Sequence, residues 1–262
     1  MSLVRNIFCS SLGKKYIMAL TGLALLGFAT GHLVGNLQVF SHPDKINGYA
    51  HFLQGLGPVL WVVRGSLLAI AALHIWAMAQ LTIENHQARP VGYDFKHTIQ
   101  ATLASRTMRW TGVVVAAFLV YHLLHFTVGA AGSDTFKANL AEYTMKGDFH
   151  LFGLTIVGKG VEVHDVHTMM VLGFQKPLVA VFYMVAVTLL GFHLWHGFES
   201  AFQSLGLRTN TWGCFLRNVS RVFAVCYILG SVAIPGAVLA GVVKQGGCSS
   251  CCPTAAAEHC NK

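Results

Sequence analysis

The sequence predicts an all-α integral membrane protein in which five long apolar helices cross the bilayer. Of its 262 residues, 54% are hydrophobic and only 11% are charged, whereas about 25% of the residues in an average soluble domain are charged. The apolar residues also collect in runs long enough to cross a hydrocarbon core of about 30 Å at about 1.5 Å per residue. These runs cover approximately 16–40, 58–83, 107–131, 177–202 and 219–243.

The five runs are expected to form one membrane domain, 1–245. Pro58 and Pro177 stand at the starts of the second and fourth runs, where a missing backbone N–H costs nothing. Pro235 lies inside the fifth run and is expected to kink it. The last residues, 246–262, are rich in cysteine, and we expect them to form a mobile tail outside this domain.

The charges predict the orientation of the helices. The N-terminus and the segments 84–109 and 204–221 hold every arginine except Arg64, together with three lysines. Because Lys and Arg concentrate on the cytoplasmic side of a membrane, the N-terminus is expected inside and the C-terminus outside. The net charge of +8 then reflects topology, and we expect no nucleic-acid partner.

Four histidines occupy related positions in the first four runs. The stretches TGLALLGFATGH, Thr21–His32, and TGVVVAAFLVYH, Thr111–His122, both read Thr-Gly, nine residues and His. The second and fourth runs contain ALHIWAM with His74 and GFHLWHG with His193. This pattern indicates that a pair of helices is repeated and followed by a fifth helix.

The positions of these histidines sort them into two levels. His32 and His122 lie about 16 and 15 residues along outward-running helices, in the outer half of the membrane. His74 and His193 both lie about 16 residues along inward-running helices, in the inner half. The sequence therefore predicts an outer pair and an inner pair of imidazoles.

Two facing imidazoles at one level can fill both axial positions of a haem iron. Ionisable residues inside a membrane are costly and indicate a functional site, and iron with both axial positions filled can only transfer electrons. We therefore expect four helices to form a bundle around two stacked b haems. A single buried histidine is more often an interhelical hydrogen-bond partner. Zinc is the alternative metal, but it is bound by four protein ligands or has an open site for water.

His125 and His196 each lie one turn beyond a proposed ligand. Matching depths favour His122 and His193 as the iron ligands. The two alternates would suit hydrogen bonds to haem propionates or to a quinone, although an exchange of roles stays open.

The chain resembles the di-haem cytochrome b membrane anchor of succinate:quinone oxidoreductases, the succinate dehydrogenases and fumarate reductases, most closely its b558-type branch. The resemblance covers roughly 12–243. It is carried by GHLVGNLQVF, INGYAHFLQGLGPVLW and VLGFQKPLVAVFYMVAVTLLGFHLWHGFESAFQSLGL. When the family's motifs are laid on this chain, its axial ligands fall on the same four histidines. The resemblance implies that His74 and His193 hold the proximal haem, and that His32 and His122 hold the distal one.

The resemblance also implies the surroundings of the chain. It would be the non-flavin membrane subunit of a respiratory-chain and tricarboxylic-acid-cycle enzyme, in the cytoplasmic (inner) membrane of a prokaryote. A flavoprotein subunit, which contains the succinate site, and an iron–sulfur subunit would carry FAD and the iron–sulfur clusters. This chain contains neither a Rossmann-type glycine-rich loop nor ferredoxin-type cysteine spacing. Its other partners would be membrane lipid and membrane quinone, with menaquinone favoured.

The quinone site is predicted only as a region. Polar residues collect around the first outer loop, among them Asn36, Gln38 and His51. Arg64 lies about seven residues inside the second helix and needs an anionic partner, for which we predict a propionate of the distal haem.

Two other functions stay open. One is a cytochrome b anchor of a different quinone-linked dehydrogenase, such as a hydrogenase or formate dehydrogenase. The other is a haem-free transporter whose histidines relay protons.

Overall fold

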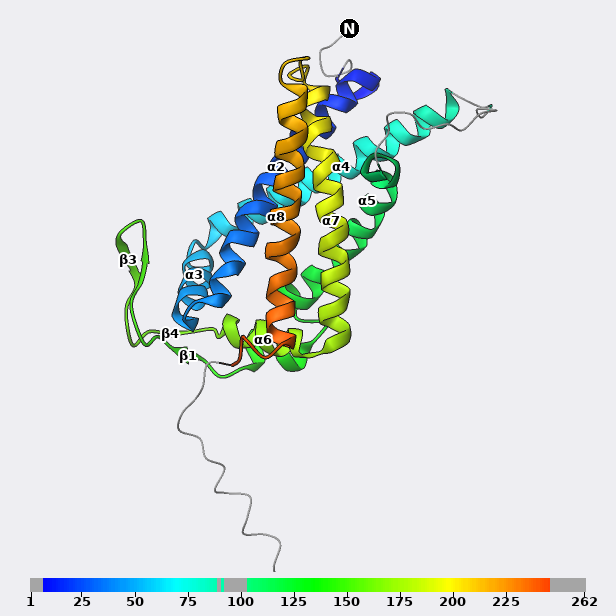
Figure 1. Cartoon of the computed structure of the whole chain (residues 1–262). Helices are drawn as coiled ribbons and strands as arrows, with labels where there is room; N and C mark the ends of the chain where they lie inside the picture. Colours follow the sequence, from blue (N-terminus) through cyan, green and yellow to red (C-terminus); the bar gives the residue numbers. More distant parts are fainter. Residues whose placement is uncertain (1–6, 89–90, 92–102, 246–262) are drawn as a thin grey trace, which may run out of the picture.

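The computed structural model describes residues 7–88, 91 and 103–245 and consists mainly of long helices (Figure 1). Five stretches are long and apolar enough to cross a membrane, as judged by length and composition: Ser11–Phe40, Pro58–Gln87, Ser105–Val128, Pro177–Ser204 and Gly213–Leu239. The five spans predicted from the sequence are confirmed, with shifts of up to six residues at their ends. The cysteine-rich segment 246–262 lies outside the described residues.

The spans are built from the helices α2 (Ser11–Asn36), α4 (Pro58–Gln87), α5 (Leu103–His122), α7 (Pro177–Ser204) and α8 (Gly213–Leu239). A 3-10 helix, η1 (Leu37–Phe40), extends α2, and a π-helical turn, η2 (Leu123–Val128), extends α5. The fifth span continues through Pro235 as one helix. Ser10 caps α2 by accepting from the backbone N–H of Gly13 at 3.0 Å, and Pro58 and Pro177 begin α4 and α7.

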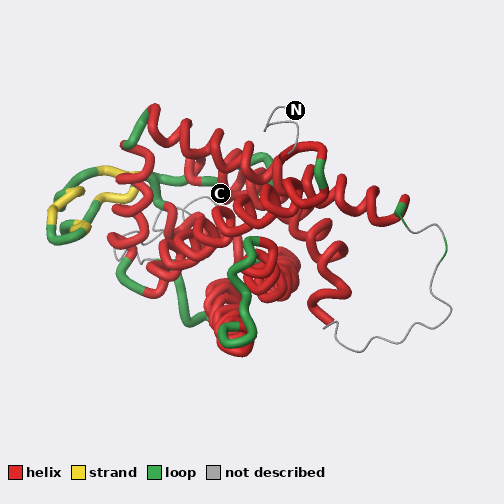
Figure 2. The backbone as a smooth tube through the Cα atoms, turned by 90° about the horizontal axis from the view of Figure 1, so that it is seen from above, coloured by secondary structure: helices red, strands yellow, loops and turns green. Residues whose placement is uncertain are grey.

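The first four long helices pack as two pairs, α2 with α4 and α5 with α7. Contacts between α2 and α7 join the pairs, and α8 lies along α7 (Figures 1 and 2). Many apolar side chains of these helices are not covered by protein, as the exposed fractions of Val62 (67%) and Leu229 (65%) show. Such side chains suit a lipid environment, because lipid tails are as apolar as the side chains themselves.

Two loops lie at the end of the bundle that the predicted orientation places outside, here called the outer end, and they contain structure that the sequence analysis did not predict. The short loop 41–57 holds the helix α3 (Pro43–Gly55). The long segment 132–176 holds the 3-10 turns η3 (Ser133–Thr135) and η4 (Lys137–Asn139), four short strands and the helix α6 (Val166–Gln175). The strands are β1 (Tyr143–Thr144), β2 (Phe149–Leu151), β3 (Leu154–Val157) and β4 (Glu162–Val163), and they pair antiparallel as β1–β4 and β2–β3.

The buried core lies towards the outer end of the bundle. Its largest apolar cluster joins η1, α3, α6 and the outer parts of α5, α7 and α8, with Val39, Phe118, Phe174, Tyr183 and Val238 among its members. A second cluster under the strands contains Met145, Phe149, Val157 and Val163. Neither cluster includes the histidines of the inner pair.

Candidate cofactor site

The structure brings the four repeated histidines together as two pairs. His32 on α2 faces His122 at the end of α5, with ring centres 5.7 Å apart and ring planes at 85°. His74 on α4 faces His193 on α7, with ring centres 6.4 Å apart and planes at 70°. These are the two pairs that the depth argument groups together, and their role as iron ligands stays a prediction.

The spacing of both pairs fits one metal ion between two rings. An imidazole nitrogen binds a first-row metal ion at about 2 Å, so two rings that share one ion have centres about 6 Å apart. His32 is exposed, and the other three rings are only half-buried by protein atoms. Protein atoms therefore do not fully enclose any of the four rings.

A hydroxyl group fixes the proton on one ring of the inner pair. Thr21 Oγ1 lies 2.6 Å from the carbonyl oxygen of Ile17 and 3.1 Å from Nδ1 of His74. A carbonyl can only accept, so the single hydroxyl proton goes to Ile17 and the oxygen must accept from the Nδ1–H of His74. With the proton on Nδ1, the Nε2 nitrogen keeps a free lone pair, which is the form that binds a metal.

The second half of the chain repeats this arrangement. Thr111 Oγ1 lies 3.0 Å from the carbonyl oxygen of Met108, to which it donates. The same oxygen lies 3.4 Å from Nδ1 of His193, at the long end of a hydrogen bond. Both rings of the inner pair therefore leave Nε2 free to bind a metal.

The glycine after each threonine makes room for the same ring. A Cβ atom at Gly22 would lie 3.1 Å from Cε1 of His74, and one at Gly112 would lie 3.3 Å from Cε1 of His193. The Thr-Gly pair of each repeat thus supports the inner pair of histidines, while the histidine that ends the repeat belongs to the outer pair. The sequence analysis missed this role and used Thr-Gly only as a marker of the repeat.

The outer pair has a different environment. Nδ1 of His122 is buried and has no hydrogen-bond partner among the described residues. The ring of His122 lies instead among aromatic rings, those of Phe118, Phe126 and Tyr183. The π-helical turn η2 begins directly after His122, and such turns are frequent at functional sites.

The two alternate ligands lie elsewhere. His125 in η2 is buried, 4% exposed, and its Nδ1 lies 3.1 Å from the hydroxyl of Tyr183. His196 is half-buried on α7, one turn beyond His193. Among the described ring contacts, neither one faces a histidine of another helix.

Two cations stand near the outer end without an acidic partner in the described part of the chain. Arg64 lies on α4 with its guanidinium carbon 5.0 Å from the ring centre of Trp61. Burial, and then the nearby charge of Arg64, lower the pKa of Lys137 in η4. The charge of Arg64 therefore acts on Lys137, and an anion between the two side chains would relieve their repulsion.

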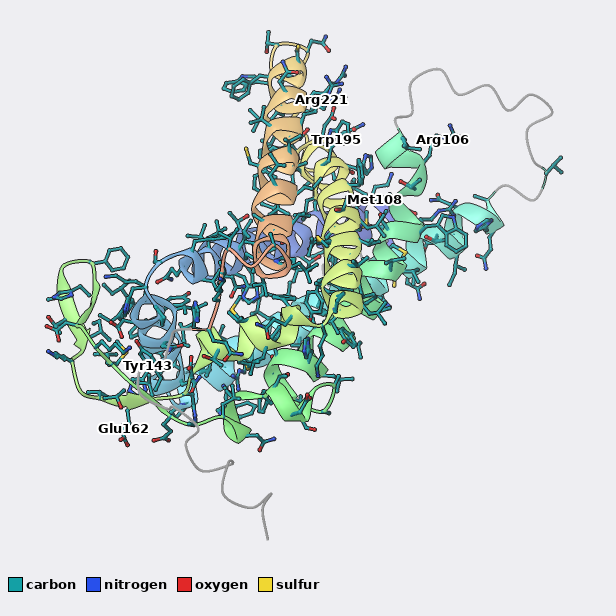
Figure 3. The ribbon with its side chains drawn as sticks, turned by 60° about the horizontal axis from the view of Figure 1, so that its bottom comes forward. Arg106, Met108, Tyr143, Glu162, Trp195 and Arg221 are labelled. Carbon is teal, nitrogen blue, oxygen red and sulfur yellow. The ribbon has the colours of Figure 1, made fainter. Side chains whose placement is uncertain are left out.

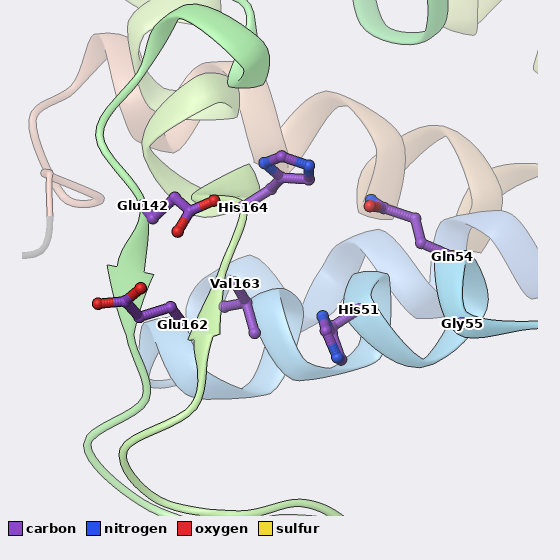
Figure 4. A pocket seen from close by; sticks show the side chains of 7 residues that line it. All are labelled: His51, Gln54, Gly55, Glu142, Glu162, Val163 and His164. Atoms are coloured by element: carbon purple, nitrogen blue, oxygen red, sulfur yellow. The ribbon is translucent and has the colours of Figure 1, made fainter.

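One of the residues suggested for a quinone, His51, lines a hollow. His51 and Gln54 of α3 line an open hollow of about 350 Å³, whose other wall carries Glu142, Glu162 and His164 (Figure 4). Asn36 and Gln38 are half-buried at the end of α2 and in η1, and they do not line this hollow.

A network of hydrogen bonds fastens the long outer segment to α3. Asp44 accepts from the hydroxyl of Tyr143 and from the backbone N–H of Lys146, both at 3.0 Å. Asn47, fully buried, donates to Asp165 at 3.2 Å and accepts from the backbone N–H of His167 at 2.9 Å. Burial, and next the hydrogen bond to Asp44, raise the pKa of Tyr143, so the phenol stays protonated.

Ion pairs brace the inner ends of the helices. Lys14 of α2 pairs with Glu84 of α4. Glu199 of α7 lies 3.1 Å from Arg208 and 3.7 Å from Arg217. Near the same end, Arg221 of α8 lies over Trp195 of α7, 5.9 Å from its ring centre (Figure 3). These contacts hold the helix ends together.

The described residues offer no larger cluster of metal-binding side chains. Within residues 7–88, 91 and 103–245, no group of three or more His, Cys, Asp or Glu side chains could hold a metal ion. A bare ion such as zinc needs four ligands, whereas a haem iron needs only two from the protein. The paired histidines therefore fit a haem better than a bare ion.

Comparison of the chain with protein-family models, with curated proteins and with solved structures finds no match. The fold itself defines the class, an all-α protein with five helices suited to crossing a membrane.

Proposed function

We propose that this chain is a di-haem cytochrome b membrane anchor that passes electrons between an iron–sulfur subunit and membrane quinone in a succinate:quinone oxidoreductase. The observation that carries the proposal is the pair of facing imidazoles at each of two levels, with ring centres 5.7 and 6.4 Å apart. When bound, the two haems would supply one-electron transfer.

The chain's own residues would hold these groups and tune them. His74 and His193 would bind the inner iron through Nε2, because Thr21 and Thr111 keep the proton on Nδ1. His32 and His122 would bind the outer iron. Because two histidines would hold each iron, oxygen would find no open site on it.

Arg64 and Lys137 would bind a propionate of the outer haem. Both side chains lack an acidic partner in the described segments, and the pKa of Lys137 is lowered by burial and by Arg64. A carboxylate between them would restore the charge balance of a half-buried site.

The membrane potential would favour one direction of electron flow. If quinone reacts at the outer side and succinate at the inner side, each electron crosses the potential, which is worth about 2.3 kcal/mol per charge per 100 mV. Menaquinone is the favoured partner, and the flavin and the clusters would belong to the two soluble subunits.

The test is purification of the native complex from a membrane, followed by a reduced-minus-oxidised spectrum and identification of the subunits. The proposal expects two haems b per chain, a covalent flavin and iron–sulfur clusters. Nickel or molybdenum in the soluble subunits would instead indicate a hydrogenase or formate dehydrogenase anchor. A spectrum without a b-type band would contradict both and favour a proton-relay transporter.

A further inference from the structure

The strands β2 and β3 form a hairpin whose tip is apolar and uncovered. Phe152 in its turn is 97% exposed, Leu154 is 68% exposed and Ile156 is 38% exposed. We call these three residues the hairpin tip. A soluble surface rarely gathers apolar side chains in this way without a binding partner.

The turn has an unusual residue in a left-handed conformation. Phe152 and Gly153 have φ values of 51° and 81°. Hairpin turns with positive φ at both central residues favour Asn, Asp or Gly, and a bulky residue in this region is an outlier that carries strain. Such strain persists where it serves a function, and here it presents an aromatic ring outwards.

The base of the hairpin is fixed, so the tip cannot fold back into the protein. Phe149 and Val157 are each 3% exposed and pack with Met145 and Val163. A Cβ atom at Gly48 of α3 would lie 2.6 Å from the side chain of Phe149, so the hairpin packs directly on the helix. The tip is therefore held at a defined place beside α3.

That place lies where two spans end, because α3 connects η1, which extends α2, to the start of α4. Figures 1 and 2 show the hairpin at the edge of the molecule, projecting sideways next to α3. On α2 and α4, which lead into and out of α3, Val34 and Trp61 are 62% and 70% exposed. The hairpin tip therefore belongs to the same end of the molecule as these exposed apolar side chains.

We infer that the hairpin tip inserts its side chains into the outer interface of the lipid bilayer and anchors the outer segment to phospholipid. A two-stranded hairpin has unpaired backbone groups at its edges, which cannot lie in hydrocarbon. The insertion is therefore shallow and limited to the side chains of the tip, in the manner of interfacial anchors that use Trp, Phe and Leu. Lys146 and Lys159, both exposed, flank the hairpin in the sequence and would meet lipid phosphates.

The test uses Phe152→Trp in the full chain, reconstituted in phosphatidylcholine–phosphatidylglycerol vesicles with and without brominated acyl chains. The matched control is Glu162→Trp on β4, at the base of the outer segment, and the unmodified chain gives the background of the native tryptophans. We expect the added fluorescence of the Phe152→Trp variant to be blue-shifted and quenched at least twofold by bromine near the headgroup. The added fluorescence of the control should be quenched far less.

Equal weak quenching in both variants would overturn the inference. Burial of the introduced indole only at high protein density in the vesicles would also overturn it, because a second copy of the chain would then be the partner. Phe152→Asn separates a folding role from a lipid role, since Asn favours the left-handed turn. The inference expects it to leave thermal unfolding in detergent unchanged or shifted upwards, and a fall of several degrees would contradict it.

Discussion

Thr21 and His74 form the contact that defines the inner site: Thr21 Oγ1 accepts the Nδ1 proton of His74 at 3.1 Å while it donates to Ile17. The hydrogen bond increases the basicity of the ring and favours the oxidised state of any iron bound to Nε2. The outer pair has no equivalent, because Nδ1 of His122 has no partner in the described part of the chain.

Thr21→Val should therefore raise the midpoint potential of the inner haem. A net hydrogen bond is worth about 0.5–1.5 kcal/mol, and the potential changes only by the difference in its strength between the two oxidation states. Because about 1.4 kcal/mol corresponds to 59 mV for one electron, we expect a rise of up to about 60 mV. Redox titration of the haem spectrum measures it. Thr21→Ser keeps the hydroxyl and should have the midpoint potential of the unmodified chain. An equal shift in both variants would show that the hydroxyl does not cause the change in potential.

Gly22→Val should remove the inner haem and leave the outer one. Even a Cβ atom at this position would lie 3.1 Å from His74 Cε1, so a branched side chain must displace the ring. The b-type absorbance per protein should fall to about half. Gly236→Ala on α8 is the control, because its Cβ would meet nothing within 4 Å and both haems should remain; retention of both haems in Gly22→Val would contradict the assigned contact.

His125→Phe should keep both haems and lower stability. His125 is buried against the hydroxyl of Tyr183, and leaving that hydroxyl without a partner costs about 1–3 kcal/mol. Thermal unfolding in detergent and haem content are the two measurements. Loss of one haem would instead indicate that His125, rather than His122, binds the outer iron. Tyr183→Phe in combination with His125→Phe should recover part of the stability.

Stability should fall as the pH drops below about 6.5, the ordinary pKa of histidine. Burial lowers the pKa of His167 in α6, so the unfolded chain takes up this proton before the folded chain does. Each pH unit between the two pKa values then removes up to about 1.4 kcal/mol, and no such loss occurs above this window. Thermal unfolding at pH 7.5, 6 and 5 measures the trend, and His167→Gln, which cannot titrate, should flatten it; an equally steep loss in that variant would assign the effect to other groups.

The spans could be predicted from the sequence because hydrophobic runs in a membrane protein need only length and composition to be recognised. The pairing of His32 with His122, and of His74 with His193, also followed from counting residues along helices. Both properties depend on the regular rise of a helix, which converts a residue number into a depth.

The outer segment could not be predicted in the same way. Its shape depends on tertiary contacts, such as those of Asp44 with Tyr143 and of Asn47 with Asp165, which join residues far apart in the chain. The role of Thr21 could not be predicted for a similar reason, since its partner His74 lies on another helix. Only the packing of α2 on α4 brings the two side chains together.

Haem content in four single variants, His32→Ala, His74→Ala, His122→Ala and His193→Ala, tests the central claim most directly. Each purified variant is assayed for haem per chain and for the midpoint potential of the haem that remains. The account predicts that the His32 and His122 variants lose one and the same haem, and that the His74 and His193 variants lose the other. Two intact haems in any of these variants, or loss of the same haem from a His32 and a His74 variant, would contradict it.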